Sequence, residues 1–294
     1  MSAQPLIPQE VTFLGLTGRA ADPATARVAV LPVPYEGTVS YKAGTAAGPA
    51  AILEASTQVE TFDDELRAEF IGPGVATCPA VPPADTPDEQ MRRVRAAAEP
   101  ILRSGKFLLT LGGEHSITAA LVAAATAVHG ALAVLQIDAH ADLRDRYDGT
   151  EHSHACVMRR VLKLAAGLCQ VGIRNFSLEE NRDCPRQVAA FVTPAVIASD
   201  PCWVDRAMTV LGDVEKVYLT IDIDGLDPSI APGTGTPEPG GLSWAQTLEL
   251  VRAVCTRRKV VAADIVEVRP IPPNHVTEFL AARLAYKIIA YTQL

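Results

Sequence analysis

The stretch FLLTLGGEHSITAALVAAATAVHGALAVLQIDAHAD, residues 107–142, decides the fold predicted for this chain. It contains two short apolar runs, 107–111 and 131–137, separated by an alanine-rich segment that the pair His129–Gly130 can end as a helix. Short apolar runs bounded by turn or charged residues are typical of buried strands in a parallel sheet. The stretch therefore predicts a strand–helix–strand unit, with Ser116 as the candidate residue that caps its helix.

The same alternation continues on both sides of this unit. We expect a helix near residues 87–104, a strand in LCQVGI (168–173), a helix in WAQTLELVRAVCT (244–256) and a strand in VVAADIVEV (260–268). Strands that alternate with helices predict an α/β protein in which helices cover both faces of a parallel sheet. No linker or charge run divides the chain, so we predict a single domain over residues 1–294.

The last segment, VTEFLAARLAYKIIAY (276–291), predicts a final amphipathic helix. The apolar side chains expected on one of its faces are Phe279, Leu280, Leu284 and Ile288.

Composition argues against several classes of protein. The first residues lack the basic start and apolar centre of a signal peptide, and six cysteines are scattered without a CxxC pair, which predicts reduced thiols and a cytoplasmic protein. No run of about 20 apolar residues suggests a membrane span. A net charge of −8 without clustered Lys and Arg gives no sign of a nucleic-acid surface, and it is compatible with a cationic substrate.

Three segments follow apolar runs and end in residue types that bind metals. They are LGGEHS (111–116), IDAHAD (137–142) and IDIDGLDP (221–228). Each would present its His and Asp residues at the carboxyl end of a strand, the edge at which open α/β sheets bind ligands. In the last two segments the ligand types alternate with small or apolar residues, so an extended backbone turns them to one side. The candidate metal ligands are His115, Asp138, His140, Asp142, Asp222 and Asp224.

Four carboxylates and two imidazoles predict a site for two divalent cations, because the carboxylates would otherwise repel one another. Ligands of this kind without thiolates suit manganese, and suit iron, cobalt, nickel or zinc less selectively. The alternative is a solvated turn at each Asp pair and a helix start at His115. Two such cations can activate a shared water for hydrolysis. His152 and His154 are candidate proton carriers, and Glu267 at the same sheet edge could pair with a cationic group.

On these motifs the chain resembles the ureohydrolases, the family that includes arginases and agmatinases. GGEHS is similar to the family's GG(D/E)HS, DAHAD to its DAHxD, and DIDGLDPSIAPGTGTPEPGGL to its longest signature, while ADIVEV matches the segment that ends in the substrate-binding glutamate. The resemblance covers nearly the whole chain. It implies an arginase-like fold, a three-layer α/β/α domain with a parallel sheet, assembled as a trimer or hexamer, with two Mn²⁺ ions per chain. Ni²⁺, Co²⁺ and Fe²⁺ are the alternative metals.

The resemblance also implies a role for each site residue. One manganese ion would be held by His115, Asp138, Asp142 and Asp222, and the other by Asp138, His140, Asp222 and Asp224. SHACVMRR looks like the SHGTPFRR segment of agmatinases, which makes His154 the proton carrier, and Glu267 aligns with the glutamate that binds the guanidinium group. His152 has no counterpart and is interpreted as a loop residue or as one that supports the site residues from behind. The implied reaction is hydrolysis of a guanidino group to urea and an amine.

The expected substrate is a small cationic guanidino compound. Arg144 stands where arginases carry an asparagine, and Ser177 where they carry an aspartate that reads the α-amino group, so both departures disfavour arginine. Agmatine, cleaved to putrescine and urea in polyamine biosynthesis, is the first choice. Aminopropylagmatine, guanidinobutyrate, guanidine, arginine and formiminoglutamate are the alternatives. The acidic residues that could read a second cationic end are Asp145, Asp148, Glu151, Glu179 and Glu180.

Other residues near these motifs are interpreted as structural. Tyr35, Gly44 and Gly48 are expected to shape the pocket wall, and Cys156 to be a packed side chain. Asp227 and Asp264 are expected to fix turns or contacts near the ligands. Two other functions stay open at this point: a deacetylase-like enzyme with a single zinc ion on the same fold, and a relative that has no catalytic activity.

Overall fold

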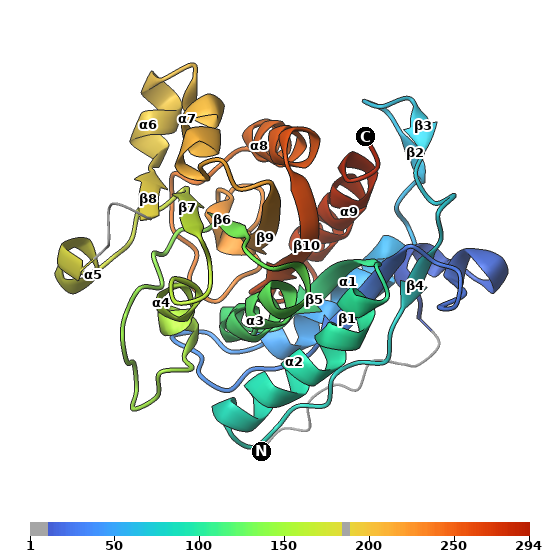
Figure 1. The fold of residues 1–294 in the computed structure, drawn as a ribbon, viewed down its shortest axis with the longest axis horizontal. Helices are drawn as coiled ribbons and strands as arrows, with labels where there is room; N and C mark the ends of the chain where they lie inside the picture. Colours follow the sequence, from blue (N-terminus) through green and yellow to red (C-terminus); the bar gives the residue numbers. More distant parts are fainter. Residues whose placement is uncertain (1–10, 184–188) are drawn as a thin grey trace.

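The computed structural model describes residues 11–183 and 189–294, and an eight-stranded sheet runs through its centre (Figure 1). All pairings between its strands are parallel, in the order β4-β1-β5-β10-β9-β6-β7-β8. The strands are β1 (Val28–Val33), β4 (Val75–Thr77), β5 (Phe107–Gly112), β6 (Ala133–Ile137), β7 (Gly167–Val171), β8 (Ala189–Val192), β9 (Lys216–Asp222) and β10 (Lys259–Val266). A separate antiparallel pair is formed by β2 (Phe62–Asp63) and β3 (Ala68–Glu69). The expected parallel sheet is confirmed.

Helices cover both faces of this sheet. One face packs against α1 (Gly48–Ser56), α6 (Pro194–Ser199), α7 (Trp203–Val210), α8 (Trp244–Arg257) and α9 (Val276–Tyr291). The other packs against α2 (Pro87–Arg103), α3 (Thr118–His129) and α4 (Val157–Val161). Successive side chains of a strand point to opposite faces, so Leu108 enters one core and Leu109 the other. The three layers explain why the strands are apolar runs without alternation, because both faces are buried.

The helix of the opening strand–helix–strand unit begins differently from the prediction. Ser116 does not cap it, because a 3₁₀ turn (His115–Ile117) comes first and the Ser116 hydroxyl donates to the Glu114 carboxylate instead. The end is as expected: the helix stops at His129, and Gly130 follows with a φ of +78°, a conformation that glycine adopts without strain.

The last helix, α9, also differs from the prediction at one residue. Leu284 and Ile288 are fully buried and Leu280 is partly buried, as expected, but the side chain of Phe279 is 44% exposed. The helix packs against both α1 and α8, so it is buried on more than one side in its later turns, whereas Phe279 lies in its first turn. A pattern of one apolar face could not indicate this second packing partner.

Four adjacent strands end at the same level, and this positions the candidate site. Ile265 of β10 pairs with Leu111 of β5 on one side and with Ile221 of β9 on the other. Ile221 in turn pairs with Ile137 of β6. The segments that follow β5, β10, β9 and β6 therefore leave the sheet beside one another, although they are far apart in the sequence.

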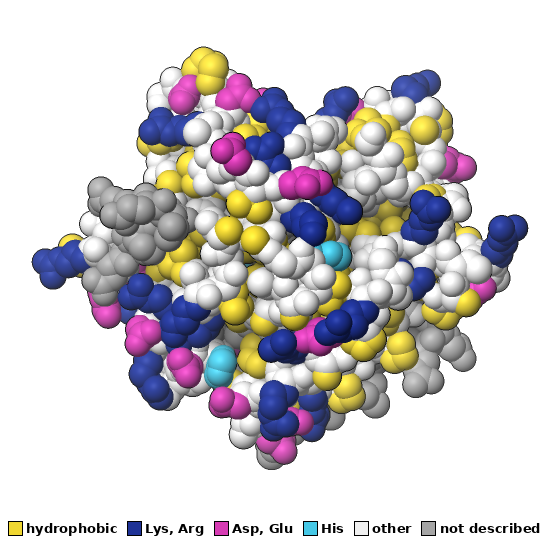
Figure 2. Space-filling view, viewed as in Figure 1, with side chains coloured by type: hydrophobic (Ala, Val, Ile, Leu, Met, Phe, Trp, Pro, Cys, Tyr) yellow, Lys and Arg dark blue, Asp and Glu magenta, His cyan; other side chains and the backbone are white. Residues whose placement is uncertain are grey.

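The surface carries both signs of charge. On most of the face shown in Figure 2, acidic and basic side chains lie beside one another. Across residues 11–183 and 189–294, no helix is both long enough and apolar enough to cross a membrane.

Candidate metal centre and active site

The imidazole of His115 faces three carboxylates at the end of β5. Its Nδ1 atom lies 3.1 Å from Asp138 Oδ2, 3.2 Å from Asp142 Oδ2 and 3.4 Å from Asp222 Oδ2. All four side chains are buried. The segments after β5 and β6 and the end of β9 thus converge as the sequence predicts.

A second group lies next to the first and shares one member with it. His140 Nδ1 lies 3.0 Å from Asp224 Oδ2 and 3.6 Å from Asp138 Oδ1. The ligand atoms of His115, Asp138 and Asp142 lie within 4.8 Å of one another, as do those of Asp138, His140 and Asp224. Asp138 therefore stands between two groups that could each hold a metal ion.

A buried hydrogen-bond chain orients His115. Its Nε2 atom lies 3.0 Å from the Thr220 hydroxyl, which donates to Asp264 Oδ1 at 2.6 Å. Because the Thr220 hydroxyl donates its only proton to Asp264, it can only accept a hydrogen bond from His115. The imidazole therefore carries its proton on Nε2 and presents Nδ1 to the carboxylates. Nδ1 is buried and has no hydrogen-bond partner. A nitrogen lone pair surrounded by carboxylate oxygens requires a cation, so this donor set fits a metal ion.

The carboxylates are held in place as well. Asp138 Oδ2 accepts a hydrogen bond from Gln136 Nε2 at 2.6 Å, and Gln170 Nε2 donates to Gln136 Oε1 at 2.6 Å. Asp224 Oδ1 accepts the backbone N–H of Ala139 at 3.1 Å. The Asp224 contact ties the segment after β6 to the segment after β9, and the two glutamines tie β6 to β7.

Without a metal ion, the pKa values show how strongly the cluster attracts cations. Burial and the charge of Asp138 raise the pKa of Asp142 to about 7. Burial alone would lower the pKa of His140, but Asp224 and Asp138 outweigh it and raise the pKa to about 12. In His115, too, the neighbouring carboxylates outweigh burial and raise the pKa well above its usual value. The negative charge of the cluster thus exceeds what its own side chains neutralise.

Two site residues have an unusual backbone. Asp142 and Glu267 have φ angles of +53° and +62°, a region that residues other than glycine seldom adopt. The backbone N–H of Glu267 donates to the Gly113 carbonyl at 2.8 Å, and Glu267 Oε1 accepts the backbone N–H of His115 at 2.7 Å. These two bonds join the ends of β10 and β5 and maintain the strained conformation of Glu267.

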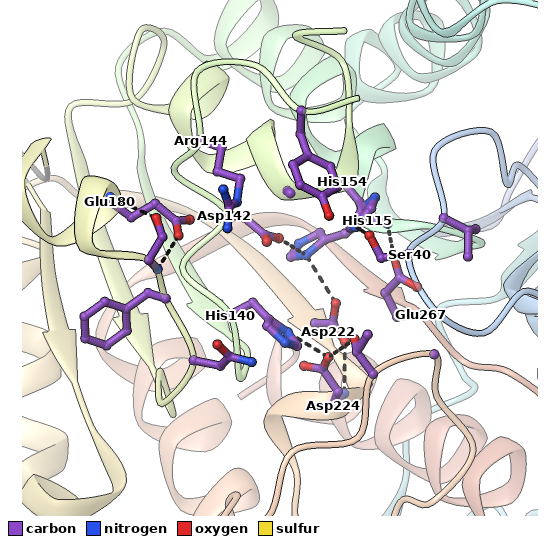
Figure 3. Close-up of a pocket in the computed structure, with 18 of the residues that line it drawn as sticks. Ser40, His115, His140, Asp142, Arg144, His154, Glu180, Asp222, Asp224 and Glu267 are labelled. Atoms are coloured by element: carbon purple, nitrogen blue, oxygen red, sulfur yellow. Dashed lines mark hydrogen bonds and ion pairs between the residues drawn. The ribbon is translucent and has the colours of Figure 1, made fainter. Parts of the chain in front are cut away.

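A cavity of about 180 Å³ opens above the cluster (Figure 3). Its floor is formed by five of the six predicted metal ligands together with Glu267, while Asp138 lies fully buried beneath them. The two predicted specificity residues also line it: the Arg144 guanidinium lies 5.1 Å from the centre of the Tyr147 ring, and the Ser177 hydroxyl accepts the Glu180 N–H at 3.2 Å.

The structure distinguishes among the five acidic residues proposed for a distal substrate group. Glu180 lines the cavity and is only 5% exposed. Asp145 and Glu151 form ion pairs with Arg160. Asp148 and Glu179 are exposed and do not line the cavity. Glu180 is therefore the one member of the five that faces a ligand in this cavity.

The two candidate proton carriers lie in different places. His154 lines the cavity, with Nδ1 3.2 Å from the Thr38 hydroxyl and Nε2 3.2 Å from the Ser40 hydroxyl. His152 points toward α2, where its Nε2 lies 3.4 Å from Asp88 Oδ1. Only His154 is within reach of a ligand in the cavity.

The prediction of which residues form the pocket wall is wrong. None of Tyr35, Gly44 and Gly48 lines the cavity, where Val39, Ser40 and Lys42 of the same segment lie instead. Gly48 is needed for packing, because a Cβ atom there would lie 2.3 Å from the Val268 carbonyl oxygen.

The other structural expectations hold for the residues described. Cys156 is fully buried, and Asp227 accepts the N–H groups of Gly240 and Gly241, which fixes a turn. Asp264 supports Thr220 beside His115. The thiols of Cys78, Cys156, Cys169, Cys202 and Cys255 are free, and Cys184 lies outside the described residues.

Glu114 and Thr38 were missed in the sequence. The fully buried Glu114 carboxylate accepts the N–H groups of Gly37 and Thr38 at 2.6 and 2.7 Å and the Thr38 hydroxyl at 2.8 Å. One signal was present: a glutamate directly after a buried strand and directly before a candidate ligand needs a partner, because an unpaired buried carboxylate is costly. Nothing in the sequence identified that partner as Thr38.

Comparison with known proteins agrees with this geometry. A model of the arginase family matches residues 26–290. N(1)-aminopropylagmatine ureohydrolase from Synechocystis sp. is 39% identical over 275 residues, covering 91% of this chain and 90% of the relative. The protein of the same name from Thermus thermophilus is 40% identical over 265 residues, covering 90% and 89%. The crystal structure of agmatine ureohydrolase from Thermoplasma volcanium superposes with a TM-score of 0.85 at 29% identity, covering 95% of this chain and 93% of that one, which confirms the expected fold.

Proposed function

Because this chain belongs to the arginase family and is a hydrolase of guanidino C–N bonds, we propose that it cleaves N(1)-aminopropylagmatine to urea and a linear triamine. The observation that carries this proposal is the position of two carboxylates, the half-buried Glu267 and the buried Glu180, on opposite sides of one cavity (Figure 3). A substrate with a guanidinium group at one end and amines toward the other matches this arrangement. Agmatine, the first choice from the sequence, is shorter. The two relatives that are 39% and 40% identical carry the name of the longer compound, whereas the solved structure at 29% identity carries that of agmatine.

We assign two divalent metal ions to the floor of the cavity. One would be held by His115, Asp138, Asp142 and Asp222, and the other by Asp138, His140, Asp222 and Asp224. The position of Asp138 between both histidines and the unpartnered Nδ1 of His115 support this assignment. Carboxylate and imidazole ligands favour manganese, with nickel, cobalt or iron as alternatives. Two such ions would lower the pKa of a shared water and so supply a nucleophile near neutral pH.

Glu267 would orient the guanidinium group. Its Oε1 atom already accepts the His115 N–H, so the second oxygen is available for the substrate. Burial, and next the charge of Glu114, raise the pKa of Glu267 well above its usual value. A guanidinium group bound beside it would stabilise the carboxylate by charge-assisted hydrogen bonds and hold the carbon atom in place for attack.

His154 would move the proton. Burial lowers its pKa, the charge of Glu114 opposes this, and the nearby His115 lowers it further, so the ring is neutral near pH 7. A neutral imidazole at the cavity wall can take a proton at Nε2 and pass it to the amine nitrogen as the C–N bond breaks. Urea and the free amine are then the products.

Glu180 would read the far end of the substrate. Its carboxylate accepts the N–H of Leu143 at 3.0 Å and that of Ser177 at 2.7 Å, which holds it at the cavity wall. The lone pairs that these bonds leave free suit an ammonium group.

Guanidino acids form the second candidate class of substrate. Arg144 also lines the cavity, and a cation there would suit a carboxylate at the distal end. The Arg144 side chain and Glu180 lie on the same side of the cavity in Figure 3, so the two candidates compete for the same region.

A single panel of assays distinguishes these functions. Urea release would be measured with N(1)-aminopropylagmatine, agmatine, guanidinobutyrate, arginine and guanidine after loading with Mn²⁺ or Ni²⁺. We expect the highest kcat/KM with N(1)-aminopropylagmatine. Highest activity with guanidinobutyrate or arginine would establish the guanidino-acid alternative instead, and no urea from any compound would indicate a relative without this activity.

A further inference from the structure

Hydroxyl groups contact both ring nitrogens of His154. Nδ1 lies 3.2 Å from the Thr38 Oγ1 atom and 3.4 Å from the Ser153 Oγ atom, and Nε2 lies 3.2 Å from the Ser40 Oγ atom. The Thr38 and Ser40 hydroxyls come from the segment after β1, whereas His154 follows β6, so the fold brings together residues more than a hundred positions apart. A hydroxyl can donate or accept, so these distances alone leave the position of the ring proton open.

The other hydrogen-bond partners of Thr38 determine which nitrogen of His154 carries the ring proton. The Glu114 carboxylate receives hydrogen bonds from two backbone N–H groups and from the hydroxyls of Thr38 and Ser116. A carboxylate surrounded by four donors offers only lone pairs, so the one proton of the Thr38 hydroxyl is directed to Glu114. Thr38 Oγ1 must then accept from the His154 ring, as it already accepts the His154 backbone N–H at 3.1 Å.

We propose that Thr38 and Glu114 are positioning residues that hold the neutral His154 ring with its proton on Nδ1, leaving Nε2 to accept a proton from the cavity. The proposal rests on the proposed role of His154. Nε2 lies beside Ser40, and both residues line the cavity. The opposite tautomer would present an N–H group to the cavity, and a neutral ring of that kind could not accept a proton there.

The same chain stabilises the ring after it gains a proton. The imidazolium keeps its Nδ1–H bond to Thr38, and the negative charge of Glu114 lies just beyond that hydroxyl. A carboxylate behind a histidine serves this purpose in serine proteases, where it sets the tautomer and stabilises the imidazolium. Here a hydroxyl is interposed. No proton moves to Glu114: the ring gains a proton at Nε2 and loses it to the departing amine, which restores the starting tautomer.

The tautomer can be measured directly. Protein labelled with ¹⁵N in the histidine rings and loaded with diamagnetic Zn²⁺ in place of Mn²⁺ would be studied by NMR, and the His154 signals identified by their loss in His154→Asn. We expect the Nδ1–H tautomer in the native chain and in Thr38→Ser, which keeps the hydroxyl. Thr38→Val, which removes it at nearly constant shape, should shift the ring toward Nε2–H. An Nε2–H tautomer in the native chain, or no change in Thr38→Val, would overturn the proposal.

Kinetics give an independent readout. Since a positioned acid–base group contributes about 10²- to 10⁴-fold, we expect Thr38→Val to lower kcat at least about 10-fold with little change in KM. The acid limb of the pH profile should move to lower pH, because the imidazolium loses its acceptor, and Thr38→Ser should restore both. Unchanged kinetics in Thr38→Val would contradict the proposal.

Two controls separate this proposal from its premise. Thr126→Val removes a hydroxyl that donates only to the Val122 carbonyl within α3, at 2.8 Å, and should leave kcat and the pH profile unchanged. Metal content would be measured in every variant, because Glu114 adjoins His115. If His154→Asn kept full activity, the proposed role of His154 would fail, whereas the tautomer measurement would still report on Thr38.

Discussion

Individual residues at this site are constrained by what surrounds them more than by their own chemistry. The ring of His115 is oriented by Thr220 and Asp264 beneath it. Glu180 differs from the adjacent Glu179 only in orientation, yet one is buried at the cavity and the other is exposed. The chemistry proposed for each side chain therefore depends on contacts that a single substitution can test.

Asp222→Asn tests the assignment of the metal ligands. The proposed role of Asp222 is to contact both ions, and an amide lacks the negative charge that balances them. We expect metal content, measured by atomic emission, to fall below two ions per chain, and urea release to fall at least about 100-fold, as expected when positioned charge is lost. A variant that bound two ions and turned over normally would show the assignment to be wrong.

Glu180→Gln tests the distal end of the substrate. Loss of the charge should raise KM for N(1)-aminopropylagmatine about 10-fold, equivalent to about 1.4 kcal/mol, with a smaller effect on kcat, because the contact forms equally in the ground and transition states. Glu179→Gln is the matched control and should behave as the native chain. Equal KM values for both variants would show that Glu180 does not bind the substrate.

At the scale of elements, a buried ion pair joins the small β2–β3 sheet to α9. Lys287 Nζ lies 2.8 Å from Asp63 Oδ2 and 3.0 Å from Glu65 Oε2, and the side chains of Lys287 and Asp63 are 3% and 0% exposed. Burial alone would raise the pKa of Asp63, but the hydrogen bond and charge of Lys287 outweigh it and lower the pKa below its usual value. The pair therefore links protonation to stability.

Lys287→Met should cost about 3–5 kcal/mol in the free energy of unfolding at pH 7, because it leaves the Asp63 charge buried and unpaired. A lowered pKa in the folded state means that the stabilisation is complete above the unfolded pKa, near 4, and is lost as the pH falls through the folded value. The difference between native chain and variant should thus shrink on acidification. Urea unfolding at pH 7 and at pH 3.5 measures it, with the exposed Lys163→Met as control. A difference that stayed constant or grew would contradict this account.

The strands themselves were easier to predict from the sequence than the order in which they pair. The apolar runs at β5, β6, β9 and β10 identified strands, because strands buried on both faces need no polar alternation. Their order was not predictable: β10, the last strand in the sequence, lies between β5 and β9, and only this places Glu267 beside the candidate metal ligands. Pairing of strands so distant in sequence depends on how the helices pack, which no local pattern records.

For the whole molecule, the candidate metal site gathers buried carboxylates from distant segments of the chain. Four carboxylates converge from the segments after β6 and from β9 and its following turn, so cations should stabilise the entire fold by binding to the native state alone. The single domain, the trimer or hexamer and the cytoplasmic location stay predictions.

Removal of metal should lower the melting temperature, and Mn²⁺ should restore it. At a free concentration one hundred times Kd, the expected gain is about 2.7 kcal/mol. It should be larger at pH 8 than at pH 6, because ligands must lose protons to bind metal and the pKa of Asp142 is raised to about 7 by burial and the charge of Asp138. Scanning calorimetry with and without EDTA at both pH values provides the measurement. The melting temperature of Asp222→Asn should change less on addition of EDTA than that of the native chain. No effect of EDTA on the native chain would argue against a metal site.

The sequence by itself determined the class of fold, the strands that carry the ligands and the identity of the six candidate ligands, because apolar runs and the residues directly after them are local features. Only the tertiary structure decided which acidic residue faces the cavity, and that Thr38, from the segment after β1, meets His154 and Glu114. These contacts join segments far apart in the chain. They depend on strand order and on the direction in which each side chain leaves its loop, and packing sets both.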